Sequence, residues 1–346
     1  MIIVNYGKDW VKATYDALAA SDIGDYLRHG MNVAIKPNMV NVTPPSNGAT
    51  THPEVVEGII KFLRDFGIRD IQIMESSAIG NNTKRAYKVC GYEGLENKYG
   101  VPLVDLKNAP TKTLTHHELD IKIAKAALEV DFLINVPVLK AHCQTRLTCC
   151  MKNLKGCIPE SEMKRFHSLG LHKPIAALAA LLPVHYNVVD GICGDLSFEE
   201  GGTPVEANRV IVGQDMVQMD TFCAELIGYR PKDIGYLNYS PPAAPAKIVE
   251  LNAEKKPTRE HKSARLADRY SSDIADDAAC STCYAALVFA MHRSNRSNRS
   301  GSQKIHIGQG YRGKSGTGIG IGNCTRRFST CVEGCPPKAV DIMEVL

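Results

Sequence analysis

The first 240 residues alternate short β-rich runs with amphipathic stretches, and this alternation constrains the fold more than any other feature of the chain. In PEVVEGIIKFLRDFG, residues 53–67, apolar side chains recur at the spacing of one helical face, with proline at the start and glycine at the end. Neighbouring apolar runs bounded by turn-forming residues are typical of buried parallel strands. The sequence therefore predicts an α/β domain in which helices are layered on a mainly parallel sheet.

A proline-rich stretch, YSPPAAPAK at residues 239–247, suits a linker better than a regular element. We place a domain boundary there, between an α/β ligand-binding domain at residues 1–240 and a small cysteine-rich domain at residues 241–346. Within the second domain, the cationic low-complexity stretch RSNRSNRSGSQ predicts a flexible insertion at residues 293–303.

The compartment is predicted from the start of the chain and from its apolar runs. The sequence turns polar at Asn5 and charged at Lys8, too early for the apolar region of an export signal. The longest apolar run, residues 174–184, is far shorter than the ~20 residues of a membrane helix. We therefore expect a cytoplasmic protein without membrane insertion, whose twelve cysteines are metal ligands, reactive thiols or core residues rather than disulfides.

Five cysteines near the end of the chain are spaced as C-x2-C, forty residues, and then C-x6-C-x3-C-P. A C-x2-C turn directs two sulfur atoms at one centre, and C-x3-C-P is how the bacterial ferredoxin run ends. Four thiolates suffice for a 4Fe-4S cluster. We expect these ligands to be Cys280, Cys283, Cys331 and Cys335, with Cys324 as the alternative. A structural zinc site is the competing interpretation, although such sites usually carry a second C-x2-C or a histidine pair.

The segment GQGYRGKS, residues 308–315, matches the Walker A phosphate-binding pattern. A phosphate cradle also requires a helix after the Lys-Ser pair. The following GTGIGIGN has glycine at four of its eight positions, and each glycine costs about 1 kcal/mol in a helix interior. We expect a glycine-rich connection that wraps closely around the cluster or a partner surface.

Positive charge is concentrated between Lys140 and Lys173, where seven Lys or Arg residues face two acids although the whole chain carries only +4. The segment follows a strand candidate, and α/β sheets bind ligands at the carboxyl ends of their parallel strands. A helix from about Cys143 would place several of its polar side chains on one stripe. We therefore expect a pocket for a carboxylate or phosphate, with binding residues Lys36, Asn38, Arg146, Lys152, Asn153 and Lys155. The expected catalytic residues are Lys140, His142 and His167, with either histidine as proton donor.

Other interpretations of this segment stay open. The charges could simply solvate a surface, which is the usual role of a charge run. Nucleic acid is disfavoured as a partner because Phe166 is the one aromatic ring of the segment available to stack on bases. Cys149, Cys150 and Cys157 are either redox-active thiols near the pocket or plain core residues.

Several separate blocks resemble one known family: IKPNMV, THPEVVEGI, NVPVLKAH, KNLKG followed by CIP, NVVDGI, and the terminal GIGIGNC with GCPPKAV. Together they are similar to the family catalogued as domain of unknown function 362. The resemblance implies a cytoplasmic protein of archaea or anaerobic bacteria with a ferredoxin-like cluster segment, and Cys280, Cys283, Cys331 and Cys335 as its ligands. It implies no particular reaction.

These features together predict an iron-sulfur oxidoreductase or electron-transfer protein that couples one 4Fe-4S cluster to an anionic ligand in the α/β domain. A redox partner such as a ferredoxin or flavoprotein is expected, and a bound flavin is conceivable although no fingerprint requires one. Two other classes remain. One is a zinc-stapled binding module for an anionic partner such as nucleic acid, and the other is a non-redox enzyme whose cluster acts as a Lewis acid.

Overall fold

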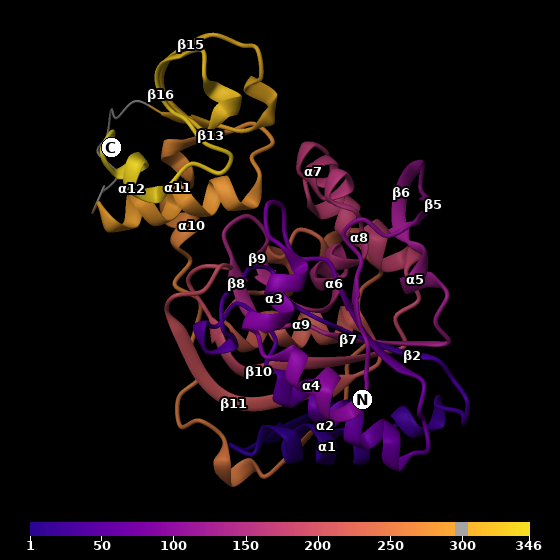
Figure 1. Cartoon of the computed structure of the whole chain (residues 1–346). Coiled ribbons are helices and arrows are strands. Elements are labelled where there is room, and N and C mark those ends of the chain that lie inside the picture. The colour runs from indigo at the N-terminus through magenta and orange to yellow at the C-terminus, as the bar shows by residue number, and fades with distance from the viewer. Residues whose placement is uncertain (295–303) are drawn as a thin grey trace.

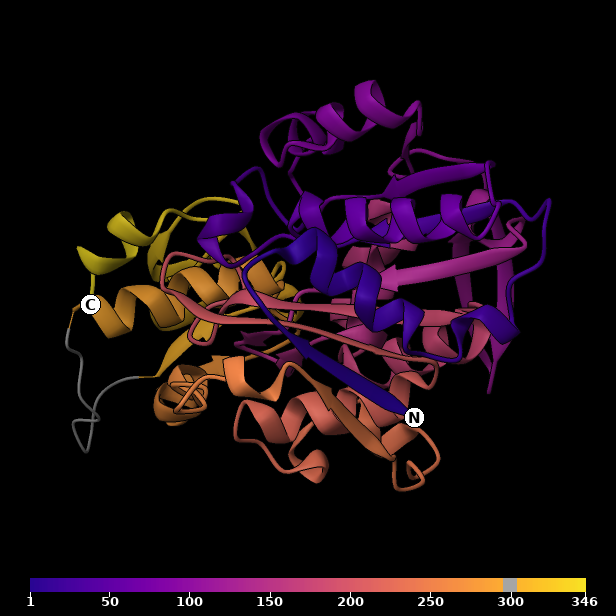
Figure 2. The ribbon, with the colours of Figure 1, turned by 90° about the horizontal axis from the view of Figure 1, so that it is seen from below.

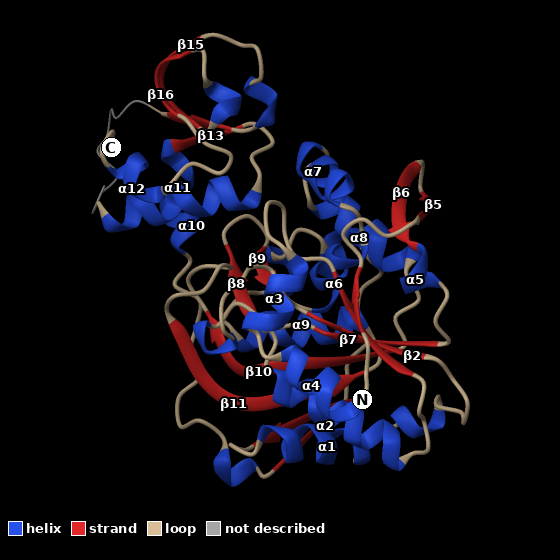
Figure 3. Cartoon of the chain, viewed as in Figure 1, coloured by secondary structure: helices blue, strands red, loops and turns tan. Residues whose placement is uncertain are grey.

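The computed structural model describes residues 1–294 and 304–346, so the expected insertion at 293–303 lies outside the described residues except for its first two positions. An eight-stranded sheet forms the centre of the larger domain (Figure 1, Figure 3). In spatial order its strands are β12 (Ile248–Leu251), β1 (Ile2–Tyr6), β11 (Pro204–Gly213), β10 (Tyr186–Asp195), β7 (Phe132–Val136), β2 (Val33–Pro37), β3 (Ile71–Glu75) and β4 (Leu103–Asp105). Only β11 runs antiparallel to its neighbours, which confirms the mainly parallel sheet.

Helices cover both faces of this sheet, as the view from below shows (Figure 2). One face packs against α1 (Trp10–Ala19), α2 (Pro53–Asp65), α3 (Thr83–Val89) and α4 (Tyr92–Tyr99). The other packs against α6 (Cys150–Asn153), α7 (Glu160–Ser168), α8 (His172–Leu181), α9 (Met216–Leu226), the short α5 (Lys125–Leu128) and the hairpin of β5 (Thr111–His116) and β6 (Leu119–Ala124). Helix α2 confirms the helix predicted from the apolar periodicity, and its apolar stripe is fully buried.

The segment after β7 differs from the prediction. Instead of a helix from Cys143, it forms an antiparallel hairpin of β8 (Lys140–His142) and β9 (Arg146–Thr148), and the helix starts only at α6. The backbone N–H groups of Gln144 and Thr145 donate to the ring Nδ1 of His142, which satisfies the turn. Arg146 adopts a positive φ of 65° as the chain leaves this turn. A side chain therefore supplies the hydrogen bonds that a helix would have made internally.

A second sheet of four parallel strands forms the small lobe, coloured orange to yellow in Figure 1. Its strands are β13 (Ile274–Asp276), β14 (Ile305–Ile307), β15 (Gly316–Ile321) and β16 (Phe328–Val332), and its helices are α10 (Leu266–Tyr270), α11 (Ser281–Arg293) and α12 (Ala339–Met343). The lobe has an apolar core of its own, to which Cys143 and Phe198 of the larger domain also contribute.

The boundary between the two parts lies later than predicted. After the proline-rich stretch the chain returns to the large sheet, where β12 pairs in parallel with β1. Strand β1 would otherwise leave its backbone donors and acceptors unpaired along an edge, and β12 satisfies them. The small lobe thus begins near Leu266 rather than at residue 241. Among the described residues, no helix is long and apolar enough to cross a lipid bilayer.

Candidate functional site

A cavity lies at the carboxyl edge of the large sheet, where the larger domain meets the start of α11. Its empty space is about 690 Å³, a figure that includes open solvent at its mouth. Seven predicted residues line it: Asn38, Lys140, His142, Lys152, Asn153, Lys155 and His167. Strands β2 and β7 and the segments that follow them bring these side chains together, as expected for the strand ends of a parallel sheet.

Three lysines give the cavity its positive charge. The Lys140 ammonium is fixed, because it donates to the carbonyl oxygens of Ala49 at 2.6 Å and Glu199 at 2.7 Å. Burial, together with the charge of Lys152, lowers the pKa of Lys140 and of Lys155 to about 7. Burial lowers the pKa of Lys152 itself to about 8. Within the described part of the chain the Lys152 ammonium has no hydrogen bond or ion pair, which leaves it free to bind a ligand.

Both histidines of the cavity are neutral near pH 7. Burial and the charge of nearby lysines hold the pKa of His142 and of His167 well below the ordinary histidine value. Since Nδ1 of His142 accepts two backbone N–H groups, its proton sits on Nε2, which lies 3.5 Å from Glu199 Oε1. Nε2 of His167 accepts from Lys155 at 3.3 Å. Neutral imidazoles donate hydrogen bonds but are weak acids, which argues against the proton-donor role predicted for them.

Buried polar atoms without a hydrogen-bond partner gather around this cavity. Ten such side-chain atoms occur among the described residues, and five belong to cavity-lining residues. These five are Asn38 Oδ1, Ser76 Oγ, Thr148 Oγ1, His167 Nδ1 and Glu199 Oε1. Each unsatisfied atom costs about 1–3 kcal/mol, so folded proteins rarely keep them without a reason. Their concentration in one place is expected of a site that completes its hydrogen bonds with a bound ligand.

A chain of asparagine amides fixes the orientation of Asn38. Its Nδ2 donates to Asn153 Oδ1 at 2.8 Å, Asn153 Nδ2 donates to Asn135 Oδ1 at 2.8 Å, and Asn135 Nδ2 donates to Asn187 Oδ1 at 3.0 Å. These residues lie on β7, on β10, on α6 and just after β2, so the network ties neighbouring elements together. With Nδ2 of Asn38 engaged, the unpartnered Oδ1 is left as an acceptor at the cavity wall.

Lys36 lies behind the cavity wall rather than in it. Its ammonium contacts Glu75 Oε2 at 2.5 Å and the carbonyl oxygen of Pro37 at 2.8 Å, and the residue is fully buried. It is therefore committed to Glu75 and is not available to an anion, in contrast to the prediction. Gly156, the last residue of the KNLKG block, approaches this pair so closely that a Cβ there would lie 1.7 Å from Glu75 Oε1.

Replacement Gly156→Ala is expected to destabilise the protein by about 1–3 kcal/mol, because the buried Glu75 carboxylate held by Lys36 cannot move aside. Urea unfolding followed by circular dichroism measures the change. The matched control is Gly94→Ala, in α4, where an added Cβ meets nothing within 4 Å. This control should gain about 0.5–1 kcal/mol from helix propensity. Equal unfolding midpoints for the two variants would show that the Lys36–Glu75 pair can move to make room for the added methyl group.

Arg146 lies outside the main cavity. Its guanidinium donates to the carbonyl oxygen of Asp233 at 2.7 Å and pairs with Asp268 at 3.2 Å. It lines a second cavity, between the β8–β9 hairpin and the small lobe. The predicted stripe that joined Arg146 to Asn153 depended on a helix, and the hairpin separates them.

Two acids that sequence reasoning missed line the cavity together with the lysines. Glu199 and Glu200 lie on the loop after β10, and Asp195 holds this loop by accepting from the N–H groups of Ser197, Phe198 and Thr203. Burial and the charge of Glu199 raise the pKa of Glu200 to about 7, against the opposing effects of Lys140 and a hydrogen bond with Thr282. A signal was available, because the acid pair lies a few residues after the NVVDGI block.

Four cysteines of the small lobe lie within electrostatic reach of one another. Burial raises the pKa of Cys280, and the charges of Cys324 and Cys335 raise it further. Burial likewise raises the pKa of Cys283 to about 12, with added contributions from the other three thiols. The loop after β14 also takes part, because Arg312 Nε donates to Cys324 Sγ at 3.4 Å.

Cys331 stands apart from these four, in contrast to the predicted ligand set. It lies on β16, paired with Gly320 of β15, and its sulfur is 3.7 Å from both Thr325 Oγ1 and the Gly322 carbonyl oxygen. Burial raises the pKa of Cys331, and the one nearby charge that raises it further is that of Glu333. The structure therefore groups Cys324, the predicted alternative, with Cys280, Cys283 and Cys335.

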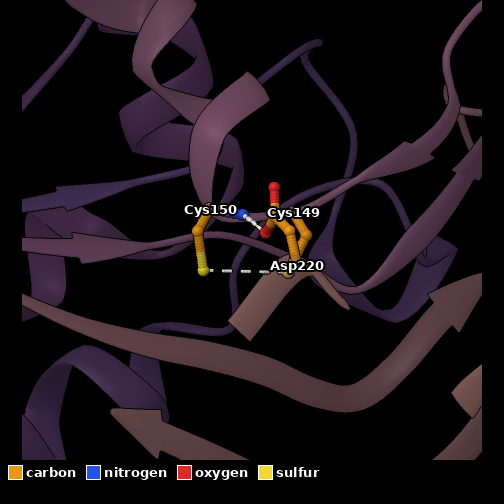
Figure 4. Close-up of side chains that lie close together, drawn as sticks. All are labelled: Cys149, Cys150 and Asp220. Atoms are coloured by element: carbon orange, nitrogen blue, oxygen red, sulfur yellow. Dashed lines mark hydrogen bonds between the residues drawn. The ribbon is translucent and has the colours of Figure 1, made fainter. Parts of the chain in front are cut away.

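A separate thiol group lies in the core of the larger domain. Figure 4 shows Cys149, Cys150 and Asp220 together, with the two sulfur atoms 3.8 Å apart and the Cys150 N–H donating to Asp220 Oδ1 at 2.6 Å. These are the three side chains, among the described residues, whose ligand atoms cluster tightly enough to hold one metal ion. Burial raises the pKa of Cys150 and of Cys157 to about 12. None of the three predicted thiols lines the cavity, and buried protonated thiols are poorly reactive, which favours the core interpretation.

These observations define a class of protein: an α/β domain with a cationic cavity at its strand ends, joined to a small cysteine-rich lobe. The model of the family described as "Domain of unknown function (DUF362)" matches residues 33–225, and the chain belongs to this family.

Individual relatives are more distant. The chain is 25% identical over 223 residues to "Thylakoid-associated protein sll1697" of Synechocystis, a match that covers 61% of this chain and 68% of the relative. Among solved structures, the lactate racemase apoprotein of Thermoanaerobacterium thermosaccharolyticum aligns with a TM-score of 0.45 and 16% identity over 65% of this chain and 57% of the racemase. A protein from Thermotoga maritima aligns with a TM-score of 0.33 and 12% identity, over 53% of this chain and 51% of that protein.

Proposed function

We propose that this protein is a cytoplasmic iron-sulfur redox protein that couples one 4Fe-4S cluster, held by Cys280, Cys283, Cys324 and Cys335, to an anionic ligand in the cavity. A ferredoxin or flavoprotein would be its redox partner. One observation carries the proposal. Ser281 and Thr282, the residues between the first two thiols, line the same cavity as Lys152 and Lys155. The C-x2-C turn that carries Cys280 and Cys283 therefore forms part of the cavity wall.

The thiol arrangement favours a cluster over the zinc interpretation. Tetrahedral zinc with Zn–S bonds of about 2.3 Å would hold its sulfur atoms about 3.8 Å apart. In the described part of the chain, no three of the four lobe sulfurs all lie within 4.8 Å of one another. Four thiols that are not drawn this closely together are compatible with a group of several iron atoms. When bound, such a cluster supplies single electrons at the cavity wall.

The Lys152 ammonium supports the proposal that the cavity binds an anionic ligand. Lys152 is the cavity lysine with no partner among the described residues, and Lys155 and Lys140 lie close enough to repel it. A carboxylate or phosphate would relieve this repulsion and accept charge-assisted hydrogen bonds. The unpartnered oxygens of Asn38 and Glu199 can accept from hydroxyl or amino groups elsewhere on the same ligand.

Proton transfer at this site is best assigned to Glu200. Its pKa of about 7 matches the pH at which an acid–base group exchanges protons most readily, whereas the cavity histidines stay neutral. Glu200 and Thr282 line the same cavity, and Thr282 lies in the C-x2-C turn. Proton and electron could therefore reach a bound ligand from the same side of the cavity. His142 would orient the ligand through its Nε2–H.

Anaerobic purification followed by metal analysis tests the proposal. The expected result is about four iron and four sulfide per chain, with visible absorption that dithionite bleaches. Zinc without iron in air-free protein would overturn it, as would iron whose absorption does not respond to reductant.

Anion binding is expected to weaken as the pH rises. The lysine pKa values of about 7 and 8 mean that the ammonium groups are protonated below pH 7 and lose their protons between pH 7 and 9. For each ammonium that the anion requires, affinity should fall about tenfold per pH unit above that pKa. Calorimetric titration with sulfate, whose charge is constant in this range, measures the effect. Affinity that is flat from pH 6 to pH 9 would exclude the lysines as the binding groups.

A further inference from the structure

An exposed basic surface lies beside Cys324 on the small lobe, and we infer that it docks an acidic electron-carrier protein. We call it the basic surface and define it as Arg312, Lys314, Arg326 and Arg327, all four exposed. The inference rests on the proposed function and adds to it the place and the charge of the partner's contact. Residues 304–338 carry six Lys or Arg and one acid, Glu333, so positive charge is concentrated in this segment of the lobe.

Hydrogen bonds join the two segments that form the basic surface. Arg312 Nε donates to Cys324 Sγ at 3.4 Å, and Arg327 Nη1 donates to the Gly313 carbonyl oxygen at 3.0 Å. The loop after β14 and the turn before β16 therefore lie side by side around the thiol. Arg326 is the residue after η9 (Asn323–Thr325), the short helix that contains Cys324.

The acids near this surface do not neutralise it. Asp277 lies 3.5 Å from Lys314 Nζ and compensates that one charge. Arg312, Arg326 and Arg327 make no ion pair with a described acid, and their charge stays exposed to solvent. A net positive field therefore surrounds the place where Cys324 approaches the surface.

The glycine-rich segment that matches a phosphate-binding pattern is part of this arrangement. It forms the short helix η8 (Gln309–Tyr311) and is followed by strand β15 rather than by a helix, so it lacks the helix N-terminus that a phosphate cradle needs. Gly308, at φ +129°, and Gly310 pack directly on Asp277, where an added Cβ would lie about 2 Å from its atoms. This close packing holds the loop against the lobe and places Arg312 beside Cys324.

The position of the thiols favours an electron carrier over other anionic partners. Cys335 is exposed and Cys324 partly exposed, so a centre that they hold would lie close to the protein surface. Complexes between redox proteins are small and short-lived, and complementary charge increases their rate of association. A positive surface around the exposed edge of the centre selects a negatively charged carrier. Nucleic acid is the other polyanion that such a surface could attract, and the experiment below separates the two.

The test is stopped-flow reduction of the anaerobically purified holoprotein by a reduced bacterial ferredoxin with net negative charge. The second-order rate constant should fall at least about tenfold between roughly 0.02 M and 0.3 M salt. The double variant Arg326→Glu/Arg327→Glu should slow this reaction at least about tenfold at low salt. Its reduction by dithionite should be unchanged, because neither arginine holds a thiol. The matched control is Lys61→Glu/Arg69→Glu, which reverses two exposed charges on and near α2, at the far end of the molecule from the lobe (Figure 1).

The possible results of this experiment test the docking surface and the proposed function separately. A rate with ferredoxin that ignores salt and both double variants overturns the docking surface, while reduction by dithionite would leave the proposed function standing. An equal slowing in both double variants would show that only net charge matters. Loss of single-stranded DNA binding in Arg326→Glu/Arg327→Glu, measured by fluorescence anisotropy, with no loss of ferredoxin reactivity would assign the surface to nucleic acid instead. Purified protein that contains no iron would overturn both the iron-sulfur function and the docking surface.

Discussion

Replacement Cys324→Ser is expected to abolish the iron-sulfur cluster, whereas Cys331→Ser leaves it in place. Cys324 shares its electrostatic environment with Cys280, Cys283 and Cys335, and Arg312 donates a hydrogen bond to its sulfur. Cys331 instead lies on β16 with Thr325 and Gly322 as its neighbours. Serine cannot replace a thiolate ligand with comparable affinity. Iron content and visible absorption after anaerobic purification should therefore drop to near zero in Cys324→Ser and stay at the wild-type level in Cys331→Ser.

The two substitutions are closely matched, because both change one thiol to a hydroxyl in the same lobe and both positions are partly exposed. Circular dichroism of both proteins would show whether the lobe is folded, and Cys335→Ser serves as a second ligand variant. If Cys331→Ser loses its iron and Cys324→Ser keeps it, the ferredoxin-like spacing is right and the grouping seen in the structure is wrong. If both keep their iron, the centre has another set of ligands.

Local spacing and the structure group different cysteines, because the spacing assumes a ferredoxin turn where the chain forms strand β16. In C-x3-C-P the first cysteine belongs to β16, whose pairing with β15 keeps Cys331 near Gly320, and only Cys335 lies beyond the strand. The sequence predicts Cys324 only as the alternative cluster ligand. It reaches the other thiols through the parallel arrangement of β15 and β16, and the connection between such strands is not visible in a spacing of cysteines.

Periodicity predicted the larger domain well because its elements bury whole faces. Strands β2, β3 and β7 and helix α2 follow from apolar patterns that any parallel sheet requires. Parallel strands also predict that the residues after them meet at one edge of the sheet, and seven of the nine predicted pocket residues do line the cavity.

The sequence does not show which lysine side chains are paired with an acid in the folded protein. Lys36 and Lys152 both belong to the resemblance blocks or stand beside them, and both looked available for a ligand. The structure commits Lys36 to Glu75, a residue 39 positions away, and gives Lys152 no pairing partner in the described part of the chain. Such pairing depends on the order of strands in the sheet. Arg146 was misplaced for a more local reason, the turn that His142 stabilises in place of a helix.

Replacement Lys152→Met is expected to weaken sulfate binding about 10- to 100-fold, because the anion loses the cavity ammonium that no other described residue engages. Methionine keeps most of the apolar length of the side chain, and removal of a poorly solvated charge should leave stability unchanged or raise it. The iron content should stay at the wild-type level, because Lys152 touches no thiol of the lobe. Isothermal titration calorimetry at pH 6.5, where the ammonium is protonated, gives the affinity.

The matched control for this substitution is Lys164→Met, which removes the same charge from the same basic segment. Lys164 is exposed on α7 and pairs with Glu160 at 2.7 Å rather than facing the cavity. Its loss should change sulfate affinity by less than about twofold, since exposed charges act weakly at physiological salt. An equal weakening in both variants would mean that anions respond to the overall field of residues 140–173. A large loss of sulfate affinity in Lys152→Met alone would place the anion inside the cavity, which the C-x2-C turn also lines.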